Sequence, residues 1–228
     1  MSDQFHLFGL PHLFLIAFVP LTAALLTWWS GKSDTTARKI RIGLATIILI
    51  DELAWYGYYW SQGWFIFPYS LPLQLCDITL WLTVYTLFTR SSRVYQVIYY
   101  WGLAGTTMAV LTPDVSTPPF SFLTLQFFIA HGGILVGILF LTWRKTILPL
   151  KGSYWKAWLW LHAYAAVIGL FDYAFSANYF FLFEKPVGIS LLEVMGPWPF
   201  YVLVGDVIAF ALFWLLWLPF RLPKDLRF

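Results

Sequence analysis

A cysteine and a histidine in apolar stretches are the residues of this chain whose types could do chemistry together. Cys76 lies in the run Leu-Pro-Leu-Gln-Leu-Cys-Asp over residues 71–77, and His131 lies in Phe-Phe-Ile-Ala-His-Gly-Gly over residues 127–133. A thiol and an imidazole can form a nucleophile and its general base, and polar groups at membrane depth are costly. A packing role for Cys76 and a structural hydrogen bond for His131 are the alternatives.

The composition is that of a polytopic membrane protein. The chain is 60% hydrophobic, 21% aromatic and only 11% charged, with a mean hydropathy of +0.72, whereas soluble domains carry about 25% charged residues. The single cysteine excludes an intramolecular disulfide. The basic residues are few and are explained by the orientation of the chain in the membrane. We therefore expect no nucleic-acid partner.

Seven apolar segments are long enough to cross a bilayer, which needs about 20 residues. They predict an all-α, seven-transmembrane-helix bundle that forms a single domain over residues 1–228. The third segment is expected to begin after a Ser70 cap, about one and a half turns before Cys76. The segments are 10–29, 42–60, 71–89, 94–112, 120–141, 155–176 and 199–219.

The loop charges predict an orientation for this bundle. If the segments alternate across the membrane, 13 of the 14 Lys and Arg residues, Lys224 and Arg227 among them, fall on one side. Only Lys185 falls on the other. The positive-inside rule then places the N-terminus outside and the C-terminus in the cytoplasm. The N-terminus lacks the basic region and cleavage site of a signal peptide, so the first helix is expected to remain in the protein as an uncleaved transmembrane helix.

Several further polar residues are candidates to support the site or bind substrate. Acids within the spans are expected to face the bundle interior or a wet cavity, because facing lipid would cost about 2.5 to 3.5 kcal/mol each. The sequence contains no metal motif such as HExxH. His162 is expected to be structural, and His6 and His12 interfacial. The supporting candidates are Asp51, Glu52, Gln74, Asp77, Asp172, Asn178 and Asp206.

The chain resembles the YwaF-type family of bacterial integral membrane proteins, relatives of transmembrane protein 164, a lipid acyltransferase. The resemblance rests on the stretches 71–76, 100–103, 111–114, 127–133, 178–182 and 196–199, which occur in the family's order. Many bacterial members have a histidine where this chain has Gln74. The family implies Cys76 as nucleophile and His131 as base. It also implies location in a bacterial cell membrane.

This resemblance implies a phospholipid acyltransferase that carries a fatty acyl group as a Cys76 thioester. Its partners would be membrane lipids, phospholipid or lysophospholipid, and no cofactor is expected. Tyrosines, Asn178 or backbone amides near the start of the third helix are candidates to stabilise the oxyanion, and Asp51, Glu52 or Asp172 to orient His131. The alternative function is a small-solute or proton-coupled transporter, or a sensor, that uses the intramembrane acids. The oligomeric state stays open.

Overall fold

A computed structural model describes residues 5–186 and 191–221 of the chain. Within these residues the regular elements are helical, and no strand occurs. Short 3-10 helices η2 (Tyr179–Phe181) and η3 (Leu191–Met195) lie between α7 and α8, and η4 (Leu218–Phe220) follows α8. The longer elements are α1 (Leu10–Ser30), α2 (Asp34–Ser61), α3 (Leu75–Thr89), α4 (Ser92–Trp101), the π-helix η1 (Gly102–Thr106), α5 (Thr107–Leu111), α6 (Phe122–Trp143), α7 (Ser153–Phe175) and α8 (Phe200–Trp217).

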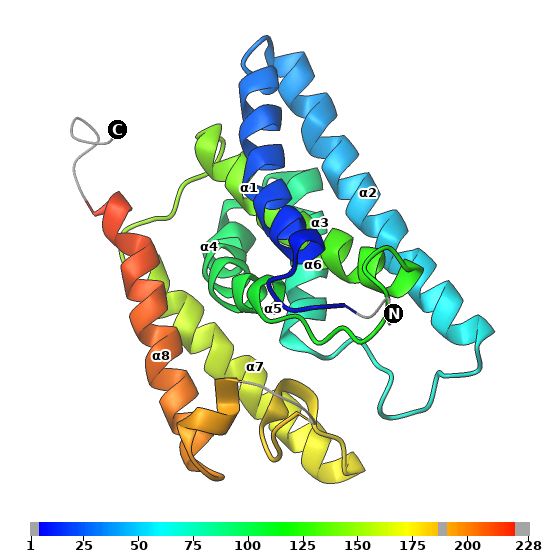
Figure 1. Ribbon diagram of the computed structural model, residues 1–228. Helices are drawn as coiled ribbons and strands as arrows, with labels where there is room; N and C mark the ends of the chain where they lie inside the picture. The colour runs from blue at the N-terminus through cyan, green and yellow to red at the C-terminus, as the bar shows by residue number, and fades with distance from the viewer. Residues whose placement is uncertain (1–4, 187–190, 222–228) are drawn as a thin grey trace.

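Helix α6 is the centre of the bundle. It contacts α1, α2, α3 and η1, while α7 packs against α4 and α8 at one side of the molecule (Figure 1). Glycines in α6 allow α2 and α3 to approach it closely. A Cβ on Gly133 would lie 2.8 Å from Ile48 Cγ1 of α2, and a Cβ on Gly137 would lie 3.3 Å from Thr83 Cγ2 of α3. Small residues at helix interfaces are a general device for packing helices in membranes.

Each of the predicted apolar segments is largely helical in the structure, and within residues 5–186 and 191–221 three helical segments are long and apolar enough to cross a membrane. These are Leu10–Ser30, Phe122–Trp143 and Phe200–Phe220. The others fall short for separate reasons. Helix α2 carries charges along its length, and α7 is rich in Trp and Tyr. The fourth segment is divided among α4, η1 and α5, of 10, 5 and 5 residues. Helix α3 has 15 residues, which span only about 22 Å of a core about 30 Å thick.

Two of the predicted segments differ in detail from the structure. The fourth contains the π-helix η1 between α4 and α5, which local pattern does not indicate. The third begins at Leu75 rather than at residue 71. Ser70 does not cap it, because the Ser70 hydroxyl donates to the Trp64 carbonyl and accepts from the Ile66 N–H in the preceding turn.

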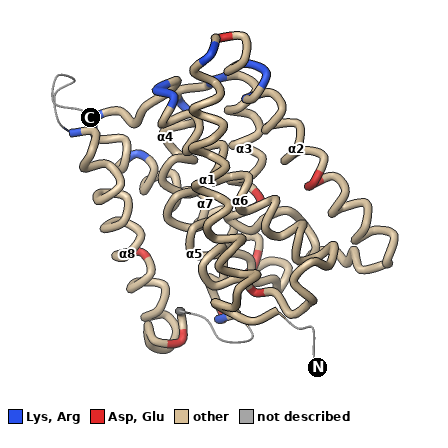
Figure 2. The backbone as a smooth tube through the Cα atoms, turned by 45° about the horizontal axis from the view of Figure 1, so that its top comes forward, with Lys and Arg blue, Asp and Glu red and all other residues tan. Residues whose placement is uncertain are grey.

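Basic residues gather at one end of the bundle, where α1 joins α2 and α3 joins α4 (Figure 2). Lys185 lies at the opposite end, in the connection that follows α7. Lys224 and Arg227, which the loop pattern assigns to the same side as the other basic residues, lie outside the described residues. The described part of the chain thus has one basic end.

Candidate active site

Cys76 is the second residue of α3, because this helix begins later than its apolar run. The first N–H groups of any α-helix lack intrahelical acceptors. The backbone N–H groups of Leu75 and Cys76 have no acceptor among the described residues. Two free backbone donors therefore lie at Cys76 and at the residue before it.

Gln74 and Asp77 hold the start of α3. The Asp77 carboxylate accepts from the Gln74 N–H at 3.0 Å, in the manner of a capping box. The Gln74 side-chain oxygen accepts from the Phe180 N–H at 2.9 Å. The Tyr164 hydroxyl donates to the Leu73 carbonyl at 2.7 Å. Gln74 and Asp77 therefore position Cys76 through the backbone.

Asp172 and Asn178 order the connection after α7. Asp172 is buried, and its carboxylate accepts from the Tyr179 N–H at 3.0 Å. The Tyr179 hydroxyl donates to the Pro68 carbonyl at 2.6 Å and so ties this connection to the segment before α3. The Asn178 side chain binds the backbone of Phe183 and Glu184. Neither candidate side chain bonds to Cys76 or His131, so both act on the loop.

His131 has a defined tautomer. Its Nδ1 lies 2.9 Å from the Phe127 carbonyl, and since a carbonyl only accepts, Nδ1 carries the proton. The ring also stacks on the Phe127 ring, with centroids 4.1 Å apart. The Nε2 lone pair has no hydrogen-bond partner in the part of the chain that the structure describes. A neutral imidazole with a free Nε2 is the form required of a general base.

The packing of α3 on α6 sets the level of Cys76 relative to His131. Thr83 lies against Gly137. One turn earlier, Thr79 and Ile134 meet at Gly102 of η1, where an added Cβ would lie 3.7 Å from Thr79 Cγ2 and 3.1 Å from Ile134 Cγ2. The two helices therefore run in the same direction with a constant register.

Cys76 lies three residues before Thr79, and His131 lies three residues before Ile134. Both are therefore displaced from the Thr79–Ile134 level by about 4.5 Å along the helix axis in the same direction. By this register we expect the two residues to lie at the same level of the α3–α6 packing. They do not hydrogen-bond to each other among the described contacts. Catalytic hydrogen bonds are often long in the absence of substrate.

Thr106 is a residue of this level that the sequence analysis missed. It lies one π-turn beyond Gly102, which packs between α3 and α6. Thr106 is 1% exposed, and its hydroxyl is buried without a hydrogen-bond partner. The sequence signal is only the small-residue run Gly-Leu-Ala-Gly-Thr over residues 102–106, which gives no hint of a π-helix. Such π-turns often occur at functional sites.

Asp51 and Glu52 lie on the α2 side of the same region. Asp51 is linked to α6 by the Gln126 amide, at 3.5 Å. Glu52 is 3% exposed, and its Oε1 atom has no partner among the described residues. The hydrogen bond of His131 goes to the Phe127 carbonyl and not to an acid. The orientation of the imidazole is therefore set by its own helix.

Asp206 and His162 form a separate pair between α8 and α7. His162 Nε2 lies 3.5 Å from Asp206 Oδ1, which also accepts from the Trp158 indole at 2.8 Å. His162 Nδ1 lies 2.9 Å from the Trp158 carbonyl, so the imidazole is also held by its own helix, α7. These contacts give His162 a structural partner in the adjacent helix.

His12 is not interfacial, as its position near the chain start suggested. It is fully buried, accepts from the Phe8 N–H at Nδ1 and therefore donates from Nε2 to the Val110 carbonyl, both at 2.9 Å. It thus joins α1 to the end of α5. No group of three or more His, Cys, Asp or Glu side chains suited to a metal ion occurs in residues 5–186 and 191–221.

A family model, that of the TMEM164 family, matches residues 7–217. The chain belongs to the TMEM164 family. No curated protein and no solved structure matches it. The matched range contains Cys76, Thr106 and His131, and all of the supporting candidates.

Membership of the TMEM164 family and the apolar helices make this chain a membrane protein. Within it, one level of the helix bundle carries a thiol, an unpaired imidazole nitrogen, an unpaired hydroxyl and two free backbone N–H groups. Chemically, such a set can supply a nucleophile, a base and donors to a developing oxyanion.

Proposed function

We propose that this TMEM164-family protein is a phospholipid acyltransferase that carries a fatty acyl group as a thioester on Cys76. The observation that carries the proposal is the α3–α6 register, with Cys76 and His131 one turn beyond the Thr79–Ile134 level. The free Nε2 of His131 adds to it. Family membership supports the same assignment.

The reaction has two balanced halves. His131 Nε2 takes the Cys76 proton, and the thiolate attacks the ester carbonyl carbon of a phospholipid, forming a C–S bond. The C–O bond then breaks, and the imidazolium gives its proton to the departing lysolipid oxygen. In the second half His131 takes the proton of an acceptor lipid hydroxyl, which attacks the thioester. The new C–O bond forms as the C–S bond breaks, and the thiolate recovers its proton.

Negative charge develops on the carbonyl oxygen in both halves. The Leu75 and Cys76 N–H groups are free donors at the end of a helix whose dipole favours negative charge. The Thr106 hydroxyl is the third donor. Removal of one such donor typically lowers kcat by about 10²- to 10³-fold.

The same proposal includes a topology and a location. The helical segments form a single seven-transmembrane domain, with α4, η1 and α5 together as one span. The basic end of the bundle (Figure 2) lies in the cytoplasm and the N-terminus outside. The α3 start, with Cys76, then lies in the outer leaflet of a bacterial cell membrane, the membrane that the resemblance to YwaF-type proteins implies. Membrane lipids there are the substrates.

Intact-mass spectrometry tests this function. Wild type, Cys76→Ser and His131→Gln are incubated with mixed phospholipids, and the protein mass is measured with and without hydroxylamine. We expect a hydroxylamine-sensitive acyl adduct on wild type, none on Cys76→Ser and much slower formation on His131→Gln. Thr83→Ala, which changes the same α3–α6 interface two turns away, is the matched control and should retain the adduct. An unmodified wild-type protein that leaves lipid composition unchanged would refute the proposal.

A proton-coupled transporter is the second candidate, and the observation that favours it is the buried Glu52 with its unpartnered Oε1. Carboxyl groups in membranes often belong to proton relays. Under this function Glu52→Gln abolishes pH-driven solute uptake into proteoliposomes, whereas Cys76→Ser leaves uptake intact. Under the acyltransferase proposal Cys76→Ser abolishes lipid remodelling, whereas Glu52→Gln has the smaller effect on it.

A further inference from the structure

Three arginines from two segments meet at the basic end of the bundle (Figure 2). Arg38 and Arg41 are three positions apart in α2, so they share one face of that helix. Arg90 follows the last residue of α3, with its backbone in the left-handed region at φ 57°. Arg38 and Arg90 are both close enough to Arg41 for their charges to repel its charge. These three side chains form the arginine cluster.

Arg41 is the fixed member of the arginine cluster. Its side chain is buried, and its Nη1 atom donates to the carbonyls of Leu87 and Phe88 near the end of α3. The other nitrogens of the guanidinium form no hydrogen bond within the part of the chain that the structure describes. Because Arg41 is already held in place, an anion bound there costs little further side-chain freedom.

No acid of the described residues balances the arginine cluster. Arg38 and Arg90 are exposed, as is Arg93 in the first turn of α4, and none of them forms an ion pair with a described residue. Asp34 is the acid of this end in residues 5–186 and 191–221, and it pairs with Arg144 at 3.0 Å. The positive-inside rule requires basic loops but not like charges on one helix face, which destabilise the helix. A bound anion would remove this repulsion.

The chemistry of the cluster and its surroundings indicates the anion. The planar guanidinium group matches a phosphate with two parallel hydrogen bonds. Apolar side chains continue from the cluster along α3, where Tyr85 and Phe88 are 50% and 42% exposed. They are three positions apart and so share one face of the helix. A phosphate that carries hydrocarbon chains would use both the charges and this face, whereas a free phosphate would use only the charges.

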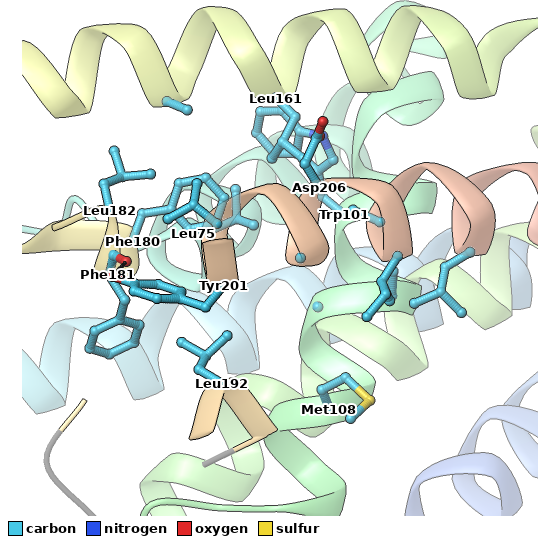
Figure 3. Close-up of a pocket in the computed structure, with 18 of the residues that line it drawn as sticks. Leu75, Trp101, Met108, Leu161, Phe180, Phe181, Leu182, Leu192, Tyr201 and Asp206 are labelled. Carbon is cyan, nitrogen blue, oxygen red and sulfur yellow. Dashed lines mark hydrogen bonds between the residues drawn. The ribbon is translucent and has the colours of Figure 1, made fainter. Parts of the chain in front are cut away.

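The cavity of about 350 Å³ between α7, α8 and the η1–α5 segment does not suit such a head group (Figure 3). No Lys or Arg lines it in the described residues, and its wall carries the Asp206 carboxylate. A phosphate there would lose its hydration without a compensating charge. The arginine cluster is also remote from the thiol, since Arg90 is 14 positions after Cys76, or about 21 Å along α3.

We propose that the arginine cluster binds the phosphate of an anionic phospholipid, whose acyl chains lie along the face of α3 that carries Tyr85 and Phe88. The lipid joins α2 to the α3–α4 turn at the end of α3 opposite Cys76. It is therefore a bound component of the fold and not a substrate. The site does not rest on the proposed acyl transfer.

Native mass spectrometry of the full chain in detergent tests this site. The protein is titrated with phosphatidylglycerol or with phosphatidylcholine of the same chains. We expect tighter binding of phosphatidylglycerol. Arg38→Gln and Arg90→Asn should each lower its affinity about fivefold and leave phosphatidylcholine binding unchanged. Arg38 is exposed, and Asn tolerates the left-handed backbone of position 90, so both variants should fold. Equal affinity for the two lipids, or wild-type affinity in both variants, overturns the proposal.

Two control variants locate the bound lipid. Lys156→Gln removes one exposed charge of the same end from α7 and should leave phosphatidylglycerol affinity unchanged. A loss equal to that of Arg38→Gln would reveal only general attraction to the basic end and overturns the site. Gly205 lines the cavity, and a Cβ there meets no atom within 4 Å, so Gly205→Leu fills the cavity without a clash. A loss of affinity in Gly205→Leu with none in the arginine variants would place the lipid in the cavity and also overturns the site.

Glycerophosphate distinguishes a lipid from a free phosphate compound, because it has the phosphate without the chains. At equal concentration it should not displace phosphatidylglycerol, and displacement would overturn the lipid assignment. Binding is measured without turnover. Phosphatidylglycerol binding at the arginine cluster in a protein that forms no thioester would therefore reject the proposed function alone, and thioester formation without this binding would reject the lipid site alone.

Discussion

Gly102 is the position at which a small change should separate the proposed catalytic residues. A Cβ there would lie 2.3 Å from Ile138 Cδ1, at least about 1.2 Å closer than the usual carbon contact of 3.5 to 4.0 Å. Cδ1 is the end of the Ile138 side chain, but Ile138 is fully buried and Ile134 Cγ2 would lie 3.1 Å from the same Cβ. We therefore expect Gly102→Ala to push η1 away from α6, at an overpacking cost of about 1 to 3 kcal/mol.

The displacement has a functional consequence. Thr106 follows Gly102 by one π-turn, so it moves away from Cys76 and His131. A misplacement of 1 Å can cost about 10²-fold in rate. We expect Gly102→Ala to lower the rate of thioester formation by about this factor and to lower the free energy of unfolding measured by SDS titration.

A second substitution makes the reasoning testable. Ile138→Val deletes the clashing Cδ1 atom and alone should cost about 0.5 to 1.5 kcal/mol. In the double variant the two costs should not add. Their interaction energy should be about 1 kcal/mol or more in favour of the double variant, and thioester formation should recover. Gly57→Ala, where an added Cβ meets nothing within 4 Å, is the control and should be neutral or stabilising. Additive effects of Gly102→Ala and Ile138→Val would show that the Gly102 contact does not set the position of η1.

Three further outcomes are expected. Thr106→Val keeps the shape of a buried side chain and removes only its hydroxyl, so thioester formation should fall about 10²-fold with little change in unfolding free energy; an unchanged rate would remove Thr106 from the oxyanion site. Gln74→Leu removes the acceptor of the Phe180 N–H and should cost about 1 to 3 kcal/mol and slow acylation, whereas Gln74→Glu, which keeps an acceptor, should restore both. His12→Leu leaves the Val110 carbonyl without its donor and should destabilise the protein by about 1 to 3 kcal/mol while acylation per folded molecule stays the same; a selective loss of acylation would give His12 a role that its contacts do not indicate.

Hydropathy predicted the helices because burial in lipid requires long apolar helices. It did not predict where α3 begins. Ser70 has the type of a capping residue, but its hydroxyl is used by the preceding turn, and the cap lies at Gln74 with Asp77. The Gln-x-x-Asp spacing was the available signal. The difference of four residues moves Cys76 from the body of the helix to its first turn.

The rest of the candidate site depends on contacts between distant segments. The π-helix η1 forms where Gly102 packs against Thr79, Ile134 and Ile138, and no local pattern specifies that packing. His12 was expected at the interface, yet it bonds to Val110, which is 98 positions away in the sequence. A single sequence contains the residue types of these contacts but not the contacts themselves.

The polar side chains inside the bundle fall into two groups by hydrogen bonding. His12 and the His162–Asp206 pair have their partners, and such groups can be explained by helix packing alone. His131 Nε2, the Thr106 hydroxyl and Glu52 Oε1 have none among the described residues.

An unpaired buried polar group lowers the free energy of unfolding by about 1 to 3 kcal/mol, and helix packing does not require such a group. The three groups named here lie where α2, α3 and η1 each contact α6, whereas other unpartnered buried atoms, among them Asp172 Oδ2 and Trp217 Nε1, lie on α7 and α8. Cys76 lies at the start of α3, so the candidate nucleophile and three unsatisfied hydrogen-bonding groups occur in the same part of the bundle. A role for these three groups in the proposed acyl transfer would account for the free energy that their missing hydrogen bonds cost.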